Sequence, residues 1–200
     1  MKIKICGIRE MQEADFCDQH GVDFLGFNFF KKSPRYISPE KAKKIITNLE
    51  HASPVALFVN EEMETILDII TYLEIEITQL HGSESPEFLK LIPGKKIKAF
   101  GIENEQDLEV AEKYSEVSDF FLFDKKSKKF GGTGKKFSWE LLKNKTIKKD
   151  FFLAGGISAD NILDIPEDVK PFAIDMASSV ETEGRKDPEK IKEVLSSLRN

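Results

Sequence analysis

The chain opens with Lys2-Ile3-Lys4-Ile5-Cys6-Gly7, and Ile8-Arg9-Glu10 follows at once. This stretch predicts a short buried strand that ends at a glycine and leads into a helix. Because side chains alternate along a strand, Ile3 and Ile5 share one face, while Lys4 and Cys6 share the other. In a closed barrel the isoleucines would meet the outer helices, and Cys6 would stand at the inner rim, where chemistry takes place. A lone cysteine is also a common small core residue, so position by itself leaves both interpretations open.

Further strands and helices alternate along the rest of the chain. Predicted strands cover residues 2–6, 22–29, 54–59, 75–80, 96–101, 119–123, 151–154 and 172–175. Predicted helices cover residues 9–20, 39–49, 63–73, 84–92, 108–114 and 188–198, with weaker helix starts near Ser138 and Ser158. The segment from Ser158 to Pro171 is short, so its helix is expected to have one turn or less. Regular alternation of this kind indicates βαβ units and a parallel sheet.

Eight such units in 200 residues predict an α/β fold, a (β/α)8 TIM barrel at the small end of its length range. An open doubly wound sheet is the competing fold. It would need a glycine-rich phosphate turn after the first strand, and Cys6-Gly7-Ile8-Arg9 is not one. No linker, repeat or low-complexity segment divides the chain, so residues 1–200 are expected to form one barrel domain.

Composition limits the classes of function. The chain is 40% hydrophobic and 32% charged, with a net charge of −5, which suits a globular domain and argues against a nucleic-acid binder. Its two cysteines, Cys6 and Cys17, show no metal-ligand spacing and make no disulfide framework. No apolar run approaches the ~18 residues of a membrane span, and no signal-peptide pattern precedes the first strand. The cytoplasm is therefore the expected compartment.

Reactive side chains follow the carboxyl ends of several predicted strands, where the active sites of barrels lie. They are Cys6, Ser33 and Arg35, Gln79 and His81, Asp124, Gly155 and Gly156, and the run Asp175-Met176-Ala177-Ser178-Ser179. His81 is either a core histidine or a substrate contact. Arg35 is either a ligand for an anionic group or an ordinary surface arginine.

Two of these loops predict a phosphate site. Gly155-Gly156 follows the seventh strand and Ser178-Ser179 follows the eighth, which is where many barrels hold a phosphate. Backbone N–H groups at such turns bind anions without a lysine. By itself a Gly-Gly pair is only a turn, but two loops in the two expected places favour phosphate. The run 125–129 is rich in lysine and is expected to be solvated, while Gly131 to Gly134 is expected to act as a hinge or lid.

The same residues resemble the phosphoribosylanthranilate isomerase family of tryptophan biosynthesis along the whole chain, in order. The matching motifs are Lys4-Ile5-Cys6-Gly7, Ser33-Pro34-Arg35, Gln79-Leu80-His81-Gly82, Asp124, Gly131-Gly132-Thr133-Gly134 with Phe137 and Trp139, Ala154-Gly155-Gly156-Ile157, and Asp175 to Glu181. One departure stands out: the family usually has Ser-Ser-Gly after the eighth strand, where this chain has Ala177-Ser178-Ser179.

The resemblance implies an Amadori rearrangement of N-(5-phosphoribosyl)anthranilate to the 1-deoxyribulose 5-phosphate aminoketose. It implies Cys6 as the general base and Asp124 as the general acid. It also implies Arg35, His81 and Gln79 in substrate binding, with the arginine on the anthranilate carboxylate. Phosphate would bind at Gly155, Gly156, Ser178 and Ser179. No metal or other cofactor is implied, and the partner is a small-molecule substrate rather than a nucleic acid or a membrane.

Two alternatives remain from the residues. One is another sugar-phosphate isomerase or synthase on the same barrel, although the related histidine-pathway isomerase would be expected to use two aspartates, and Cys6 argues against it. The other is a catalytically inactive barrel kept for binding or assembly.

Overall fold

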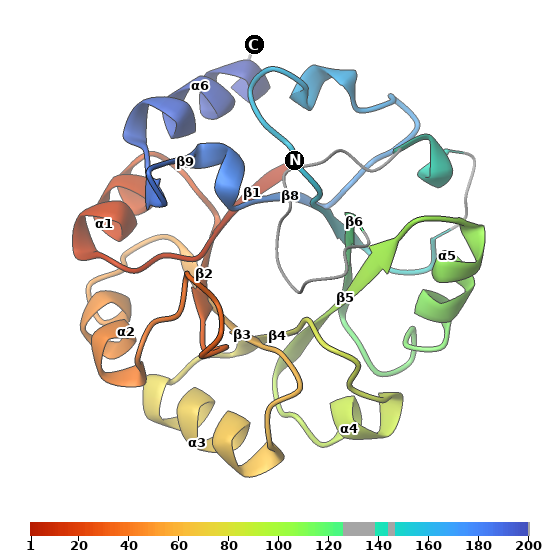
Figure 1. The fold of residues 1–200 in the computed structure, drawn as a ribbon, viewed down its shortest axis with the longest axis horizontal. Helices are drawn as coiled ribbons and strands as arrows, with labels where there is room; N and C mark the ends of the chain where they lie inside the picture. Colours follow the sequence, from red (N-terminus) through yellow and green to blue (C-terminus); the bar gives the residue numbers. More distant parts are fainter. Residues whose placement is uncertain (126–138, 144–146, 200) are drawn as a thin grey trace.

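The computed structural model describes residues 1–125, 139–143 and 147–199. Eight parallel strands follow one another in sequence order and close into a barrel, as predicted (Figure 1). They are β1 (Lys2–Cys6), β2 (Phe24–Asn28), β3 (Ser53–Phe58), β4 (Ile77–Leu80), β5 (Lys95–Ile102), β6 (Phe120–Lys125), β7 (Phe151–Leu153) and β8 (Ala173–Met176). The barrel closes where β1 pairs with β8, with Lys4 opposite Asp175.

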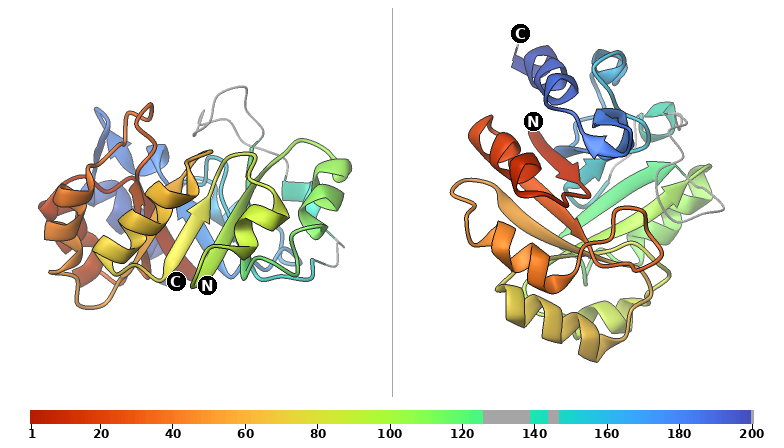
Figure 2. Two further views of the ribbon diagram at one scale, coloured as in Figure 1. Left: turned by 90° about the horizontal axis from the view of Figure 1, so that it is seen from below. Right: turned by 60° about the vertical axis from the view of Figure 1, so that its left-hand side comes forward.

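Helices form a ring outside the strands, and the side view shows the strands tilted within that ring (Figure 2). They are α1 (Met11–Gln19), α2 (Pro39–Ile46), α3 (Met63–Leu73), α4 (Pro86–Lys90), α5 (Glu105–Glu112) and α6 (Pro188–Arg199). The start of α2 shows why the sequence folds this way. Ser38 caps the helix by accepting a hydrogen bond from the N–H of Lys41, and Pro39 occupies the first turn.

The chain after β6 departs from the regular pattern. Among the described residues, the segments after β6 and β7 carry short 3₁₀ turns, Trp139–Leu142 and Ile162–Asp164, and no α-helix. The second of these confirms the expectation of one turn or less. A small hairpin that the sequence analysis did not predict follows β8: β9 (Glu181–Thr182) pairs antiparallel with β10 (Arg185–Lys186). Glu183 and Gly184 both have positive φ between these strands, as a tight hairpin turn requires.

The opening strand alternates as predicted. Ile3 and Ile5 are buried in the outer core between the strands and the helices. Cys6 lies in a separate small cluster with Leu57 and Val59. An inner apolar layer fills the barrel; its buried members are Phe24, Val55, Ile97, Ala99, Leu122, Phe152, Ala154 and Ala173.

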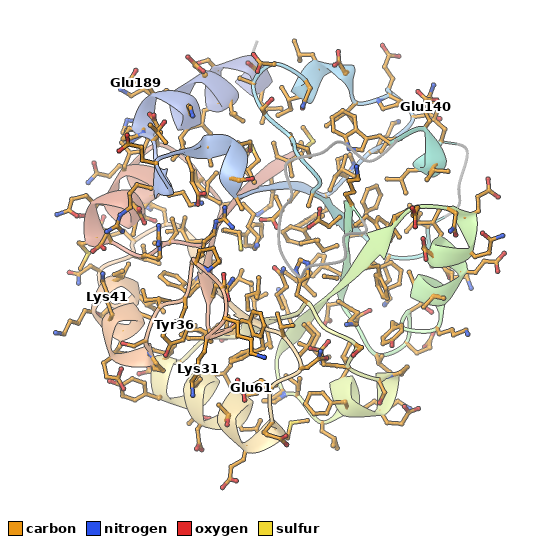
Figure 3. The ribbon with its side chains drawn as sticks, viewed as in Figure 1. Lys31, Tyr36, Lys41, Glu61, Glu140 and Glu189 are labelled. Carbon is orange, nitrogen blue, oxygen red and sulfur yellow. The ribbon has the colours of Figure 1, made fainter. Side chains whose placement is uncertain are left out.

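Charged side chains such as Lys41, Glu140 and Glu189 project outward from the ring of helices (Figure 3). Among the described helices, none has the length and apolar character needed to cross a membrane. The predicted lysine-rich run beyond Lys125, the predicted hinge at 131–134 and the predicted helix start at Ser138 lie outside the described residues.

Candidate active site

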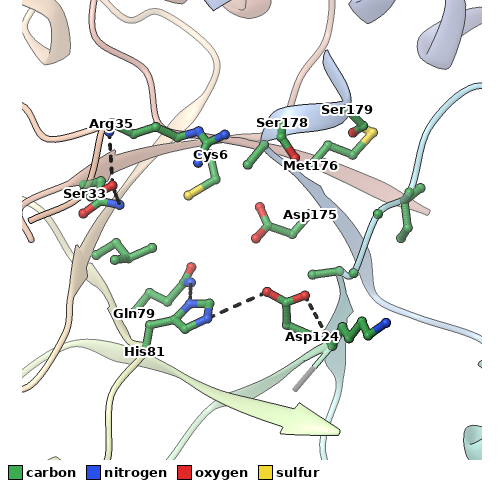
Figure 4. Close-up of a pocket in the computed structure, with 18 of the residues that line it drawn as sticks. Cys6, Ser33, Arg35, Gln79, His81, Asp124, Asp175, Met176, Ser178 and Ser179 are labelled. Carbon is green, nitrogen blue, oxygen red and sulfur yellow. Dashed lines mark hydrogen bonds and ion pairs between the residues drawn. The ribbon is translucent and has the colours of Figure 1, made fainter. Parts of the chain in front are cut away.

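A cavity opens to solvent at the carboxyl ends of the strands. The structure brings all the predicted site residues together in its lining: Cys6, Arg35, Gln79, His81, Asp124, Gly155, Gly156, Ser178 and Ser179. Their side chains converge from different strands and loops, as Figure 4 shows for most of them. Residues up to 173 positions apart therefore share one pocket because the parallel strands all end on the same rim.

A buried ion pair lies beneath the thiol. Lys4 Nζ donates to Asp175 Oδ1 at 2.8 Å, and the two side chains are 0% and 9% exposed. Burial would lower the pKa of Lys4, but the Asp175 carboxylate and the Cys6 sulfur outweigh it, and the net effect is a raised pKa. The floor of the pocket therefore carries a protonated lysine next to the cysteine.

Cys6 is 7% exposed. From the sequence, Lys4 on the same strand face and the helix N-termini at the rim would be expected to lower the pKa of the Cys6 thiol, but in the structure this pKa is not lowered. Burial raises that pKa above its ordinary value, and the charges of Lys4 and Lys186 offset the rise only in part. The reason is desolvation: the hydration free energy that an anionic sulfur loses in this enclosed place is larger than its attraction to the nearby cations. The free enzyme thus holds Cys6 mainly as the thiol.

Asp124 lies at the end of β6, across the pocket from Cys6 (Figure 4). Burial raises the pKa of its carboxyl to about 6, with the Asp175 carboxylate acting in the same direction. The N–H of Lys125 donates to Asp124 Oδ1 at 2.7 Å and lowers the pKa in part, as does Lys4. A general acid needs a raised pKa of this kind, because its carboxyl then keeps its proton up to a pH closer to neutral.

His81 and Gln79 form a pair at the end of β4. Gln79 Nε2 lies 3.0 Å from His81 Nδ1, and His81 Nε2 lies 3.9 Å from Asp124 Oδ2. Burial lowers the pKa of His81 to about 4, and the charges of Lys4 and Lys98 act in the same direction. The imidazole is therefore neutral at pH 7, so its contact with Asp124 is no salt bridge there. Gln79 Oε1 is buried without a partner among the described residues, which leaves it available to a ligand hydroxyl.

Arg35 enters the pocket from the loop after β2. Its Nε and Nη2 donate to Oε1 and Oε2 of Glu181, each at 2.7 Å, in a two-pronged pair. Lys186 Nζ also donates to Glu181 Oε1, at 2.7 Å. Burial would raise the pKa of Glu181, but Arg35 and Lys186 outweigh it and lower it to about 2. Gly7 makes room for the arginine, because an added Cβ there would collide with Arg35 Cδ.

The two loops of the predicted phosphate site line one side of the cavity. Gly155 and Gly156 have φ values of 90° and 84°, which favour glycine at both positions. Asn161 holds this turn, since its Nδ2 donates to the carbonyl oxygen of Gly156 at 2.9 Å. Ser179 needs no left-handed backbone, so serine in place of the usual glycine is compatible with the path of its loop.

Several groups in and behind this pocket were not predicted from the sequence. Asn28, at the end of β2, lines the cavity, and strand alternation with Phe24 could have indicated it. Asp175 was placed on the rim but given no role, although its partner Lys4 also faces the barrel interior. Lys186 was not singled out at all, because no local pattern shows that its side chain is buried. Among the described residues, no group of three or more His, Cys, Asp or Glu side chains could hold a metal ion.

One known protein family and several known proteins are similar to this chain along nearly its whole length. The family model for N-(5'phosphoribosyl)anthranilate (PRA) isomerase matches residues 3–197. An N-(5'-phosphoribosyl)anthranilate isomerase of Bacillus cereus is 41% identical over 199 residues, which cover 98% of this chain and 96% of the relative. The enzyme of the same name from Thermotoga petrophila is 40% identical over 204 residues, covering 100% and 98% of the two chains.

Solved structures are also similar to this chain over its whole length. A crystal structure of phosphoribosyl anthranilate isomerase from Thermotoga maritima superposes with a TM-score of 0.92 at 39% identity, covering 100% of this chain and 98% of the other. A second structure of such an enzyme, with a TM-score of 0.87 at 36% identity and the same coverage, is a complex with reduced 1-(o-carboxyphenylamino)-1-deoxyribulose 5-phosphate.

Proposed function

This chain belongs to the N-(5'phosphoribosyl)anthranilate isomerase family, and we propose how its pocket carries out that isomerisation. The substrate, N-(5'-phosphoribosyl)anthranilate, is an aminoaldose that becomes an aminoketose in an Amadori rearrangement, a step of tryptophan biosynthesis. The reaction needs an acid to protonate the ring oxygen as the furanose opens. It then needs a base to remove the proton from C2 of the open-chain sugar.

Asp124 is the acid in this proposal. Its pKa of about 6 leaves about a tenth of the carboxyl protonated at pH 7, against about a thousandth at its ordinary pKa. Proton transfer to the ring oxygen breaks the bond between C1 and that oxygen and leaves a positively charged imine. The neutral His81 beside Asp124 adds no positive charge that would draw the proton off the carboxyl.

Cys6 is the base. The cationic imine makes the C2 proton acidic, and a thiolate at the rim of β1 can remove it to form the enolamine. Lys4 and Lys186 both favour the anionic sulfur, so the small thiolate fraction has two cations near it. A proton then adds to C1 and the C2 hydroxyl loses its proton, which gives the ketone.

The observation that carries the proposal is the placement of Cys6 and Asp124 on opposite sides of one pocket, with the pKa of the aspartate raised by burial. Its test is turnover of phosphoribosylanthranilate by the purified protein, followed by loss of anthranilate-type fluorescence. Turnover supports the proposal. No turnover by folded protein would identify a catalytically inactive barrel.

Removing Arg35 is expected to weaken substrate binding. The planar guanidinium suits the anthranilate carboxylate, and charge-assisted contacts of this kind are strong. Arg35→Ala should therefore raise KM ~10-fold or more, and kcat should change less, since the carboxylate lies away from the reacting carbons. Steady-state kinetics of the wild type and the variant would show this. An unchanged kcat/KM would mean that Arg35, although it lines the cavity, has no part in substrate binding.

Phosphate or sulfate is expected to bind between the Gly155-Gly156 turn and the Ser178-Ser179 loop. Both loops line the cavity, and their backbone N–H groups suit an anion. A crystal structure in the presence of phosphate would locate the anion. An anion found only at the lysine-rich run 125–129 would contradict the assignment.

The complex of the related enzyme with the reduced product analogue supports a small-molecule ligand in this cavity, and we propose that the same compound binds here. The charge balance continues to argue against nucleic acid as a partner. The cytoplasm is the compartment we propose for the chain, because this is where its substrate would be made.

A further inference from the structure

The pair formed by Arg35 and Glu181 raises a question about carboxylate recognition. The guanidinium gives two of its donors to the glutamate in a two-pronged contact, and the side chains are 16% and 8% exposed. As a unit this pair is electrically neutral. A neutral pair would attract a second carboxylate only weakly, since the glutamate repels what the arginine attracts.

A third side chain changes this sum of charges. Lys186 Nζ donates to Glu181 Oε1 at 2.7 Å and to the carbonyl oxygen of Ala177 at 3.0 Å. Its side chain is 1% exposed, so its charge is barely screened by water. The cations Arg35 and Lys186 against the anion Glu181 leave one positive charge on the cluster.

The hairpin explains how Lys186 reaches this place. Lys186 lies directly opposite Glu181 in the pairing of β10 with β9, so their side chains lie on the same side of the hairpin. Contacts with α1 hold β10: the N–H of Lys186 donates to Glu13 Oε1 at 3.2 Å, and Arg185 Nη1 lies 2.8 Å from Glu10 Oε1.

One donor group of Arg35 remains for a ligand. No described residue accepts a hydrogen bond from Nη1, while Nε and Nη2 are both committed to Glu181. Arg35 lines the cavity, and its guanidinium lies beside Cys6 in the close-up view (Figure 4). Lys186 does not line the cavity, so it makes no direct contact with a ligand there, and the pair of Arg35 and Glu181 stands in front of it.

We propose that Lys186 is a positioning residue for the carboxylate of the substrate: its charge cancels that of Glu181, so that Arg35, although paired, still binds an aromatic carboxylate through Nη1. The inference rests on the proposed function and specifies how that function selects a carboxylated substrate. Glu181 orients the guanidinium, and Lys186 restores the charge that this orientation would otherwise neutralise.

The role of Lys186 is tested by the preference of the pocket for a carboxylate. We define this preference as the Kd of a ligand without the carboxylate divided by the Kd of the same ligand with it. The two probes are reduced 1-(o-carboxyphenylamino)-1-deoxyribulose 5-phosphate and its phenylamino counterpart, and titration calorimetry measures both. Because both probes keep the phosphate and the sugar chain, general damage to the pocket affects them alike and leaves the ratio unchanged.

Lys186→Met is expected to lower this preference ~10-fold or more, because the cluster becomes neutral. The variant should fold, since the remaining Arg35–Glu181 pair leaves no buried charge uncompensated. The double variant Glu181→Gln with Lys186→Met removes one charge of each sign and returns the cluster to a single positive charge. It is expected to recover most of the preference, whereas purely structural damage would add up in the double variant.

Lys98→Met combined with Glu84→Gln is the matched control, because Lys98→Met alone would leave the carboxylate of Glu84 buried without its cation. Lys98 is also buried and also paired, with Glu84 Oε2 at 2.7 Å, but that pair lies outside the lining of the cavity. This control should leave the preference unchanged. An unchanged preference in Lys186→Met, or a loss that the double variant does not recover, would overturn the inference. If wild-type protein did not turn over phosphoribosylanthranilate at all, the proposed function itself would fail, which the activity assay shows separately.

Discussion

Replacing Cys6 by alanine is expected to lower kcat at least ~10²-fold while the protein folds normally. The variant has no group on β1 that can remove the C2 proton, because the nearest cation, Lys4, is held protonated by its contact with Asp175. Folding should survive because the thiol packs only in a small cluster with Leu57 and Val59. Cys6→Ser should also be poor, since a hydroxyl is a far weaker base than a thiolate.

Cys17 offers the matched control for this experiment. It is a fully buried cysteine of α1 in the outer core, and burial raises its pKa to about 12. Cys17→Ala should keep near-native turnover, although it loses some stability through the buried atom removed. Steady-state kinetics with circular dichroism and thermal melting would separate catalysis from folding. Near-native kcat in Cys6→Ala would return Cys6 to the role of a core residue.

Replacing Asp124 by asparagine is expected to cost a similar factor, at least ~10² in kcat. Asparagine keeps the size of the side chain and an oxygen that can accept from the N–H of Lys125, but it has no acidic proton to give to the ring oxygen. Stopped-flow fluorescence of both proteins at saturating substrate would measure the difference. If Asp124→Asn turned over normally, another group would be the acid, and His81, 3.9 Å away, would be the first to test.

The pH profile of kcat/KM follows from the same pair. Catalysis needs protonated Asp124, with a pKa of about 6, and ionised Cys6, with a pKa above its ordinary value. Because the acid has the lower pKa, the active state is a minor form of the singly protonated pair. The value of kcat/KM should rise as the pH increases through about 6, stay level, and fall above the pKa of the thiol. The two apparent pKa values of this profile belong to the coupled pair and not to either residue alone. A limb near pH 6 that persists in Asp124→Asn would belong to another group, such as the substrate phosphate.

Much of the fold and of the site position follows from local patterns in the sequence. The alternation of Ile3 and Ile5 with Lys4 and Cys6 predicted which side chains face the barrel interior, because a strand has a fixed period of two. Eight strand–helix units predicted the closed barrel. The parallel order then placed the end of every strand on one rim, so Cys6, Asp124 and the other predicted site residues could be assigned to one pocket from the sequence.

The remaining features depend on contacts that no local pattern contains. The Lys4–Asp175 pair joins residues 171 positions apart, and the burial of Lys186 depends on a hairpin pressed against α1. The raised pKa of Cys6 was missed for the same reason, since desolvation depends on everything packed around the sulfur. The hairpin itself had a signal, Glu183-Gly184 between two short polar pairs, which is a typical tight turn.

The central claim is that Cys6 removes the C2 proton of phosphoribosylanthranilate in this pocket. The most direct test is a single turnover with enzyme in excess, followed by loss of fluorescence, with substrate carrying hydrogen or deuterium at C2. For the wild type the account predicts slower conversion of the deuterated substrate, and for Cys6→Ala conversion at least ~10²-fold slower with either. Conversion by Cys6→Ala at the wild-type rate would contradict it.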